Sequence, residues 1–380
     1  MERNAPLSIP TMYDRAMQAL YKLALAPVAE TTADKNSYGF REDRSCADAV
    51  GAAFNALSKL NSATWILEGD INGCFDHISM NWLMANIPIE KRILRQWLQA
   101  GYVEKGFYFP TRKGTPQGGI ISPTLANMTL DGLEQAVLKA VPRRSRVNFI
   151  RYADDFIITG KSKTILMKNV LPAVKRFLIE RGLELSEEKT KINYIRHGFT
   201  FLGQTFRKYG NTLRITPAKQ GVLALKRKVG ALIRKYTNAP MIILITKLNQ
   251  IIRGWANYHR YVVASEVFGR VDNYIYEQLW YMLRRRHPQK SKRWLRKKYW
   301  STIGKGSIFA VVTRYKSKVK LYQVIRACSI KIKRYRKIIA DANPYMPEFA
   351  GYFWRRRHNR EARLLPELSA RQMRLAFGRN

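Results

Sequence analysis

Two adjacent aspartates, Asp154 and Asp155, stand between two apolar runs in the segment RYADDFIITG. The runs predict a β-hairpin over residues 148–159 with the acidic pair at its turn. Neighbouring carboxylates beside buried strands repel each other unless a cation neutralises them, and their hard oxygen atoms suit Mg²⁺. The pair therefore indicates a magnesium site, although an exposed Asp-Asp turn would give the same four letters, YADD.

A third carboxylate, Asp70, ends a mostly apolar run in the segment WILEGDINGCFD, and Asp76 follows it. The run predicts a buried strand over residues 64–70. Phosphoryl transfer with two Mg²⁺ ions, roughly 3.5–4 Å apart, needs carboxylates from separate strands to bridge the ions. One ion would activate an attacking hydroxyl, and both would stabilise charge on the transferring phosphate. Taken alone, Asp70 is also consistent with a helix cap or a turn.

A glycine-rich loop, GTPQGG at residues 114–119, lies between the two acidic segments. Glycines let the backbone come close to a base or sugar, and free N–H groups at a helix N-terminus favour phosphate. A helix is predicted to begin at Ser122-Pro123, with the serine as its cap and the proline at its first position. We expect the loop to face a nucleotide.

The elements that would position these residues are of both types. Apolar spacing predicts helices over residues 11–29, 46–60, 88–102 and 163–181, the second capped by Ser45. Further strands are predicted over residues 107–111, 199–206 and 213–215, the last two joined by a turn at residues 209–211. After Pro217, long basic amphipathic helices are predicted over residues 218–236, 240–261, 267–286 and 290–299.

The charge of the chain is strongly asymmetric. The 380 residues carry a formal net charge of +41, of which residues 201–380 carry +34. A solvated helix face normally mixes both signs, so this excess indicates a polyanionic partner or an anionic membrane surface. No run of 18 apolar residues predicts a membrane span. The three cysteines form no CxxC pair and the five histidines are scattered, which argues against disulfide and zinc sites and favours an intracellular protein.

Six segments, in order, resemble the reverse transcriptase/maturase encoded by group II introns: SYGFREDRS, LEGDINGCFDHIS, GTPQGGIISPTLANMTLDGLE, RYADDFIITG, LSEEKTKI and GFTFLGQTF. The resemblance runs from about Leu7 to Tyr345. It implies an α+β right-hand polymerase with an antiparallel palm sheet, followed by an all-α, basic thumb and maturase region called domain X. The expected domains are fingers and palm over 1–206, thumb and domain X over 207–335, and an Arg-rich nucleic-acid-binding segment over 336–380.

The resemblance also implies roles for single residues in the polymerase site. Asp70, Asp154 and Asp155 would bind two Mg²⁺ ions, and Ile71 would join both the metal and the nucleotide sites. The aromatic ring of Phe75 would crowd a 2′-hydroxyl and so exclude ribonucleotides.

Other polymerase residues implied by the resemblance are basic or lie in the glycine-rich loop. Gln117 and Gly118 would line the nucleotide pocket, and Lys189 would protonate the leaving pyrophosphate. Arg41 and Arg44 would lie in the fingers near the incoming strand. For these basic residues a surface ion pair is the open alternative.

The string RGWANYHRY after Pro217 is typical of domain X. Its candidate RNA-binding residues are Arg253, Trp255, Tyr258 and Arg260. Arg meets phosphates, while Trp and Tyr stack on unpaired bases. Packing inside a helix pair is the alternative for the two aromatic residues, and it is the favoured one for Trp255.

The implied function is an RNA-directed DNA polymerase that binds group II intron RNA, assists its splicing and copies it into DNA for retrohoming. Its partners would be intron RNA, an RNA template with a DNA primer, and dNTPs, in a bacterial cytoplasm. The family has further sequence before PLSIPT and often ends in an HNH endonuclease, so we expect an N-terminally short form without that domain. The alternative is a splicing maturase with an incomplete, inactive polymerase site. A basic nucleic-acid chaperone is a more distant reading, which the ordered carboxylates oppose.

Overall fold

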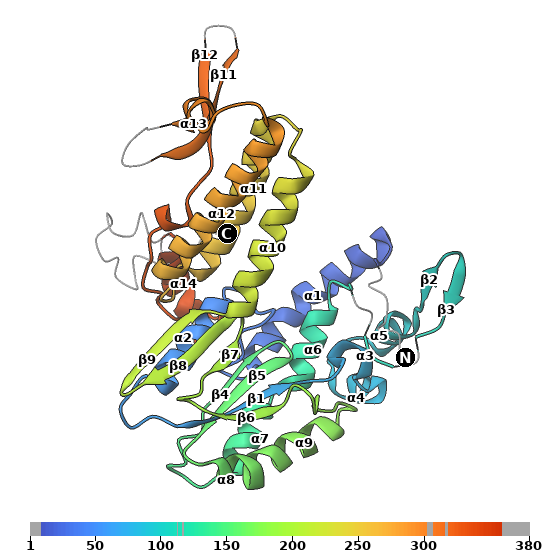
Figure 1. Ribbon diagram of the computed structural model, residues 1–380. Coiled ribbons are helices and arrows are strands. Elements are labelled where there is room, and N and C mark those ends of the chain that lie inside the picture. The colour runs from blue at the N-terminus through green and yellow to red at the C-terminus, as the bar shows by residue number, and fades with distance from the viewer. Residues whose placement is uncertain (1–8, 112, 116–117, 302–306, 316–317, 359–380) are drawn as a thin grey trace. The chain divides into compact units, whose positions relative to one another are not determined.

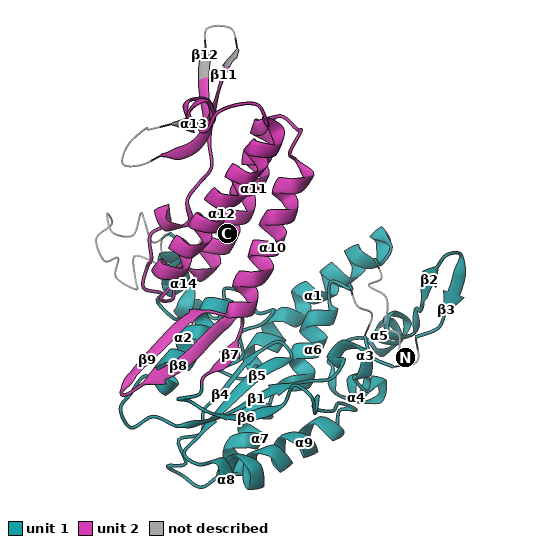
Figure 2. Cartoon of the chain, in the orientation of Figure 1, with its two compact units in different colours: residues 1–197, 336–380 teal, residues 198–335 magenta. Residues whose placement is uncertain are grey.

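A computed structural model describes residues 9–111, 113–115, 118–301, 307–315 and 318–358. The chain forms two compact units, one of residues 1–197 with 336–380 and one of residues 198–335 (Figure 2). Helices and antiparallel sheets occur in both units, which confirms the predicted α+β class. No helix within the described ranges is long and apolar enough to cross a membrane.

A four-stranded antiparallel sheet forms the centre of the first unit, in the order β4-β5-β1-β6 (Figure 1). Its strands are β1 (Trp65–Asp70), β4 (Phe149–Tyr152), β5 (Asp155–Gly160) and β6 (Lys191–Tyr194). The apolar runs found in the sequence supply its interior, because Ile66, Phe156 and Ile158 are fully buried. The predicted hairpin around the acidic pair and the predicted strand before Asp70 are both confirmed.

The first unit also contains ten α-helices in its described residues. They are α1 (Met12–Thr32), α2 (Cys46–Leu57), α3 (Cys74–His77), α4 (Met80–Asn86), α5 (Lys91–Gln99), α6 (Ser122–Leu130), α7 (Leu133–Lys139), α8 (Lys163–Ile165), α9 (Leu171–Ile179) and α14 (Ala350–Arg357). A π-helical turn over Leu166–Val170 joins α8 to α9, and a small hairpin consists of β2 (Tyr102–Glu104) and β3 (Phe107–Phe109). Apolar side chains of α4–α7 and α9 pack with those of β1, β4 and β5 in one core.

Two helix starts in this unit test the predicted caps. Ser45 caps α2 as predicted, and a reciprocal bond from the Ser45 backbone to the Asp48 side chain completes a capping box. The predicted cap at Ser122 is wrong. Ile121, which already has helical dihedral angles, stands at the cap position of α6, and Ser122 is a buried residue of its first turn.

The second unit begins with a three-stranded antiparallel sheet of β7 (Phe199–Phe201), β8 (Gln204–Tyr209) and β9 (Thr212–Pro217). The strand predicted over 199–206 is broken, because Leu202 and Gly203 both adopt positive φ and turn the chain back. The helices α10 (Lys219–Lys235), α11 (Met241–His259), α12 (Ser265–Arg286) and α13 (Lys292–Tyr299) follow, as predicted.

The expectation of an all-α region over residues 207–335 is wrong. It contains half of β8 and all of β9 at its start, and a second antiparallel sheet of β10 (Trp300–Ser301), β11 (Ile308–Tyr315) and β12 (Lys318–Gln323) near its end. The run Val311-Val312-Thr313 explains this sheet, since β-branched side chains favour strands over helices.

Candidate active site

Three aspartates meet at one end of the central sheet. Antiparallel pairing of β1 with β5 sets Asp70 opposite Asp155. Tyr152 pairs with Asp155 at the end of the β4–β5 hairpin, so Ala153 and Asp154 form a two-residue turn. Ala153 has a φ of 57°, in the left-handed region that tight hairpin turns require. The sheet register therefore brings together all three carboxylates that the sequence singled out.

The surroundings of these carboxylates disfavour their charged forms. Burial raises the pKa of Asp155 to about 7, and the charges of Asp70, Asp154 and Glu68 add to that rise. Burial and the nearby Asp70 also raise the pKa of Asp154. A cation placed among the carboxylates would relieve this repulsion.

Lys189 reaches the same cluster from the loop before β6. Its Nζ donates to Oδ2 of Asp70 at 2.9 Å, and this partner raises the pKa of Lys189. The backbone N–H of Ser186 donates to the Asp70 carbonyl at 2.8 Å and anchors the loop. The structure thus brings Lys189 to the three carboxylates, and the ion pair that is its alternative role is formed.

The donor set fits a hard divalent cation, because it consists of carboxylate oxygens whose mutual repulsion a cation would offset. Among the described residues, however, no group of three or more His, Cys, Asp or Glu side chains is already arranged to hold a metal ion. A bound cation would have to take an Asp70 oxygen from Lys189 and draw the carboxylates together. Ile71 as a whole is 2% exposed and forms a β-bridge with Leu185, so the structure places it in the interior directly after Asp70.

Phe75 lies half-buried on α3, with its ring 6.2 Å from that of Phe40. The glycine-rich loop is held against this helix, since Thr115 N–H donates to the Phe75 carbonyl at 2.6 Å. Gly114 is required there: a Cβ at that position would lie 2.3 Å from the Phe75 carbonyl oxygen. Gly118 has a φ of 106° and is exposed, and Gln117 lies outside the described residues.

Arg41 and Arg44 are turned inward in the structure. The Arg41 guanidinium pairs with Glu30 at 2.5 Å and donates to the carbonyls of Asp34 and Ser37 at 2.6 and 2.9 Å. The Arg44 side chain is 1% exposed and donates to the carbonyls of Lys35, Ala340 and Ala342. The structure thus places both arginines among protein partners in the interior, whereas the alternative for them was a surface ion pair.

Arg151 is a site residue that sequence reasoning missed. It is fully buried beside the acidic hairpin, paired with Asp131 at 2.6 Å, and it donates to Asn127 at 3.1 Å. Its Nη1 also lies 3.4 Å from the Ala153 carbonyl oxygen and so supports the turn. Burial raises the pKa of Asp131 to about 7, although Arg151 acts in the opposite direction. The sequence feature that could have identified Arg151 is an arginine inside the apolar run FIRY, shortly before the acidic pair.

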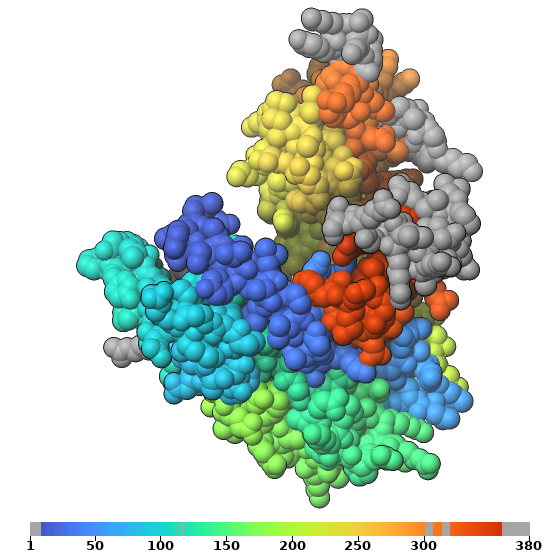
Figure 3. All heavy atoms as spheres, turned by 180° about the vertical axis from the view of Figure 1, so that it is seen from behind, coloured from blue at the N-terminus to red at the C-terminus, as the bar shows by residue number. Residues whose placement is uncertain are grey.

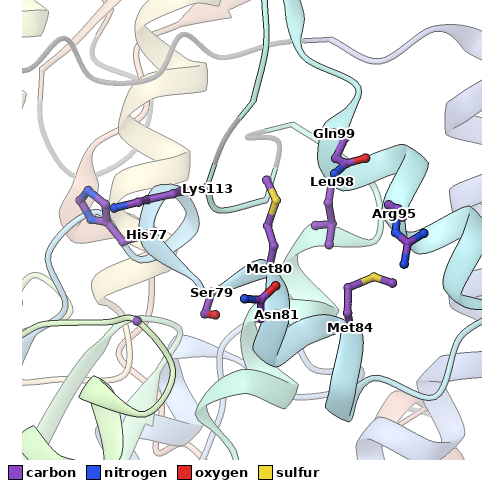
Figure 4. A pocket seen from close by; sticks show the side chains of 10 residues that line it. His77, Ser79, Met80, Asn81, Met84, Arg95, Leu98, Gln99 and Lys113 are labelled. Carbon is purple, nitrogen blue, oxygen red and sulfur yellow. The ribbon is translucent and has the colours of Figure 1, made fainter.

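A pocket of about 540 Å³ lies beside α3, α4 and α5 (Figure 4). Lys113 and His77 lie at one end of it, and Arg95 and Gln99 lie at the other. Met80, Met84 and Leu98 supply apolar walls between these ends. No carboxylate is among the described residues that line it, so the pocket suits an anionic or neutral ligand.

The four candidate RNA-binding residues lie on or directly after α11. Arg253 is exposed, and no hydrogen bond or ion pair is recorded for its side chain in the described part of the chain. The Trp255 ring packs against those of His259 and Phe268 at 4.7 and 5.5 Å, yet it also lines a pocket of about 530 Å³ between α10 and α11.

The other two candidates of this group have protein partners. The Tyr258 ring is 43% exposed, and its hydroxyl donates to the Leu202 carbonyl at 2.8 Å. Arg260 donates to the Lys331 carbonyl at 3.1 Å and to Asn257 at 3.1 Å. Arg253 is therefore the candidate best placed to meet a phosphate.

Two family models match the chain. The reverse transcriptase (RNA-dependent DNA polymerase) family matches residues 3–206, and the group II intron maturase-specific domain matches residues 222–300. The chain belongs to the reverse transcriptase family. With its maturase-specific domain it is of the group II intron type, which confirms the resemblance carried by the motifs.

Relatives support this assignment. The group II intron-encoded protein LtrA of Lactococcus lactis is 30% identical over 53% of this chain and 44% of its own length. A 91 kDa protein in the cob intron of Schizosaccharomyces pombe is 25% identical over 71% of this chain and 43% of its own length. The chain thus spans less than half the length of these relatives. Among solved structures, a Candida tropicalis telomerase aligns with a TM-score of 0.39 and 18% identity over 53% of this chain and 45% of its own, which adds nothing to the family match.

Proposed function

We propose that the chain is an RNA-directed DNA polymerase that binds group II intron RNA, assists its splicing and copies it into DNA for retrohoming. The observation that carries this proposal is the register of β1 and β5, which sets Asp70 opposite Asp155 with Asp154 in the adjoining turn. In this reading the first unit holds the fingers and palm, and the second unit holds the thumb and domain X.

Asp70, Asp154 and Asp155 would hold two Mg²⁺ ions, with the backbone of Ile71 alongside. Bound there, the ions would supply activation of the primer hydroxyl and stabilisation of charge on the transferring phosphate. Binding of a cation would release Lys189 from Asp70, and the protonated ammonium could then give a proton to the leaving pyrophosphate. The Asp70 charge keeps this ammonium protonated until that point.

The nucleotide would lie on the surface that α3 and the adjoining glycine-rich loop form together. Phe75 would meet the sugar at its 2′ position, where the Phe40 ring limits how far the Phe75 ring can turn. Gln117 and Gly118 would line the same pocket. A 2′-hydroxyl would collide with the aromatic ring, so dNTPs are the expected substrates.

RNA would be held mainly by the second unit, whose residues 198–335 include 31 Lys and Arg but only 3 Asp and Glu. Each phosphate contact releases condensed counterions, so this charge favours binding of a polyanion. The described part of the Arg-rich segment, residues 336–358, differs from the second unit in this respect. Its Arg356 and Arg357 pair with the carboxylates of Asp48 and Asp43 in the first unit. The RNA contacts are therefore proposed for α10–α13 and not for α14.

A splicing maturase without polymerase activity is the second candidate. It is favoured by the Lys189–Asp70 ion pair, together with the inward positions of Arg41 and Arg44. Extension of a DNA primer on an RNA template with Mg²⁺ and dNTPs separates the two. The polymerase proposal expects extension by the purified chain and none by Asp155→Asn. No extension by the unmodified chain, with intron splicing still accelerated, would establish the maturase instead.

A further inference from the structure

A polar network in the first unit joins parts of the chain that are about 300 residues apart. The Asp48 side chain on α2 is fully buried. Its Oδ1 accepts from the Ile338 backbone N–H at 2.6 Å and from the Arg356 guanidinium at 2.8 Å. Its Oδ2 accepts from the Ser45 backbone N–H at 3.0 Å. The charge of this carboxylate is thus balanced largely by residues from the far end of the chain.

Residues 336–357, called here the return segment, make further contacts with the loop before α2. The Arg44 guanidinium donates to the carbonyls of Ala340 and Ala342 at 2.9 and 3.3 Å. The Tyr345 hydroxyl donates to Glu42 at 2.8 Å, and Arg357 pairs with Asp43. In Figure 3 the return segment, in red, lies against the blue N-terminal part of the unit. The segment therefore binds the loop along most of its length.

This loop in turn supports the acidic hairpin. The Tyr38 N–H donates to the Arg151 carbonyl at 2.9 Å, and the Arg151 N–H donates to the Asn36 carbonyl at 2.9 Å. Gly39 lies so close to the turn that a Cβ there would be 2.3 Å from the Ala153 nitrogen. Ala153 directly precedes Asp154. A continuous set of contacts thus runs from the return segment through the loop to the carboxylate turn.

Loss of a hydrogen bond in this network would be costly, because its central groups are buried. Hydrogen bonds to ionised groups are stronger than neutral ones, and a buried carboxylate is costly when it loses its partners. Arg44 lies over the Tyr38 ring at 5.6 Å, so the residue that binds the return segment also packs on the one that binds Arg151. Release of the return segment would therefore loosen the Arg44 and Tyr38 side chains together.

We propose that the return segment is a clamp that holds the acidic hairpin in its catalytic geometry, with Arg356 and Asp48 as positioning residues. This proposal rests on the polymerase function proposed above. Neither residue would touch substrate. They act by keeping the loop of residues 36–44 pressed against Ala153, and so keep Asp154 and Asp155 in register with Asp70.

The test is Arg356→Gln in the full chain, compared with Arg355→Gln. Arg355 is an exposed neighbour on the same helix, and no ion pair is recorded for it in the described part of the chain. Small displacements of reacting groups cost up to about 100-fold in rate, so kcat for primer extension should fall on the order of 10- to 100-fold in Arg356→Gln only. The KM for dNTPs and the RNA affinity should stay the same, and Arg356→Lys should recover much of the rate.

Hydrogen exchange gives a readout that does not depend on polymerase activity. The amides of Tyr38 and Arg151 should exchange faster in Arg356→Gln, whereas they should stay protected in Arg355→Gln. If the unmodified chain does not extend primers, the polymerase proposal fails, and these two amides still decide the clamp. If Arg356→Gln does not fold, Tyr345→Phe removes a single hydrogen bond to Glu42 and should give a smaller change of the same kind. Faster exchange at Ile338 with unchanged kcat and unchanged exchange at Tyr38 and Arg151 would overturn the clamp.

Discussion

Asp70 and Asp155 face each other across β1 and β5, and Lys189 binds the Asp70 carboxylate at 2.9 Å. Among the described residues, the Lys189 ammonium thus lies beside the carboxylates of Asp70, Asp154 and Asp155, and burial raises the pKa of Asp155 to about 7. A cluster of this kind is destabilising for the fold unless a cation joins it. Under the proposed function, a bound cation would relieve this repulsion among the carboxylates.

The first prediction concerns Asp155→Asn, which removes a charge from this cluster. Primer extension should fall by more than about 100-fold, because the proposed Mg²⁺ ions lose a carboxylate ligand. Their stabilisation of charge on the transferring phosphate is lost with it. RNA affinity should not change. The melting temperature without Mg²⁺ should rise, since repulsion with Asp70 and Asp154 is relieved. Glu104→Gln, on the exposed β2 strand, is the matched control and should leave all three measurements unchanged. Normal extension by Asp155→Asn would refute the metal assignment.

The second prediction concerns Phe75→Ala. Loss of the ring should increase incorporation of ribonucleotides relative to deoxyribonucleotides by about tenfold or more, because a 2′-hydroxyl no longer meets an aromatic edge. Single-nucleotide extension with matched dNTP and NTP pairs measures the ratio. Phe107→Ala, in the exposed β2–β3 hairpin, should leave it unchanged. An unaltered ratio in Phe75→Ala would place the sugar discrimination elsewhere.

The third prediction concerns pH and His259, which is 5% exposed, with Nδ1 2.9 Å from Nε2 of Gln204. Burial lowers the pKa of His259 from 6.5 to about 4. The unfolded chain therefore takes up a proton at a higher pH than the folded chain. Stability should be full above pH 6.5 and should fall as the pH drops toward 4, by up to about 3 kcal/mol.

Thermal melting of the full chain between pH 7 and pH 4 tests this coupling. His259→Gln should melt lower at pH 7, because the buried ring contacts are lost, but its melting temperature should depend less on pH. His197→Gln, at an exposed histidine of the first unit, should keep the wild-type slope. Equal slopes in His259→Gln and wild type would show that His259 does not control the acid sensitivity.

The acidic site could be predicted from the sequence because its parts are local patterns. A strand that ends in Asp70 and a hairpin that turns at Asp154-Asp155 follow from apolar runs of a few residues. Antiparallel pairing then sets the carboxylates together. The Ser45 cap and the basic helices after Pro217 are equally local, and they formed as predicted.

The parts that were missed depend on distant contacts or on competing preferences. Asp48 pairs with Arg356, 308 residues away. No short sequence pattern around either residue predicts this contact. The resemblance implies that Arg44 lies near the incoming strand, but carbonyls of the return segment bind it in the interior. The β11–β12 hairpin was missed because its β-branched residues lie within a strongly basic region, for which helices were expected.

The last prediction concerns Arg253, the exposed arginine of α11. If it contacts an RNA phosphate, Arg253→Gln should weaken binding to intron RNA and to scrambled RNA alike, because a phosphate contact carries no sequence information. The slope of log affinity against log salt should become shallower by roughly 0.7–0.9, the contribution of one phosphate. Titrations of the full chain at several salt concentrations measure both effects. Lys168→Gln, an equal change of charge at an exposed lysine of the first unit, is the control and should leave the slope as it was. An unchanged slope in Arg253→Gln, or an equal loss in Lys168→Gln, would show that the RNA phosphates do not contact α11 at this residue.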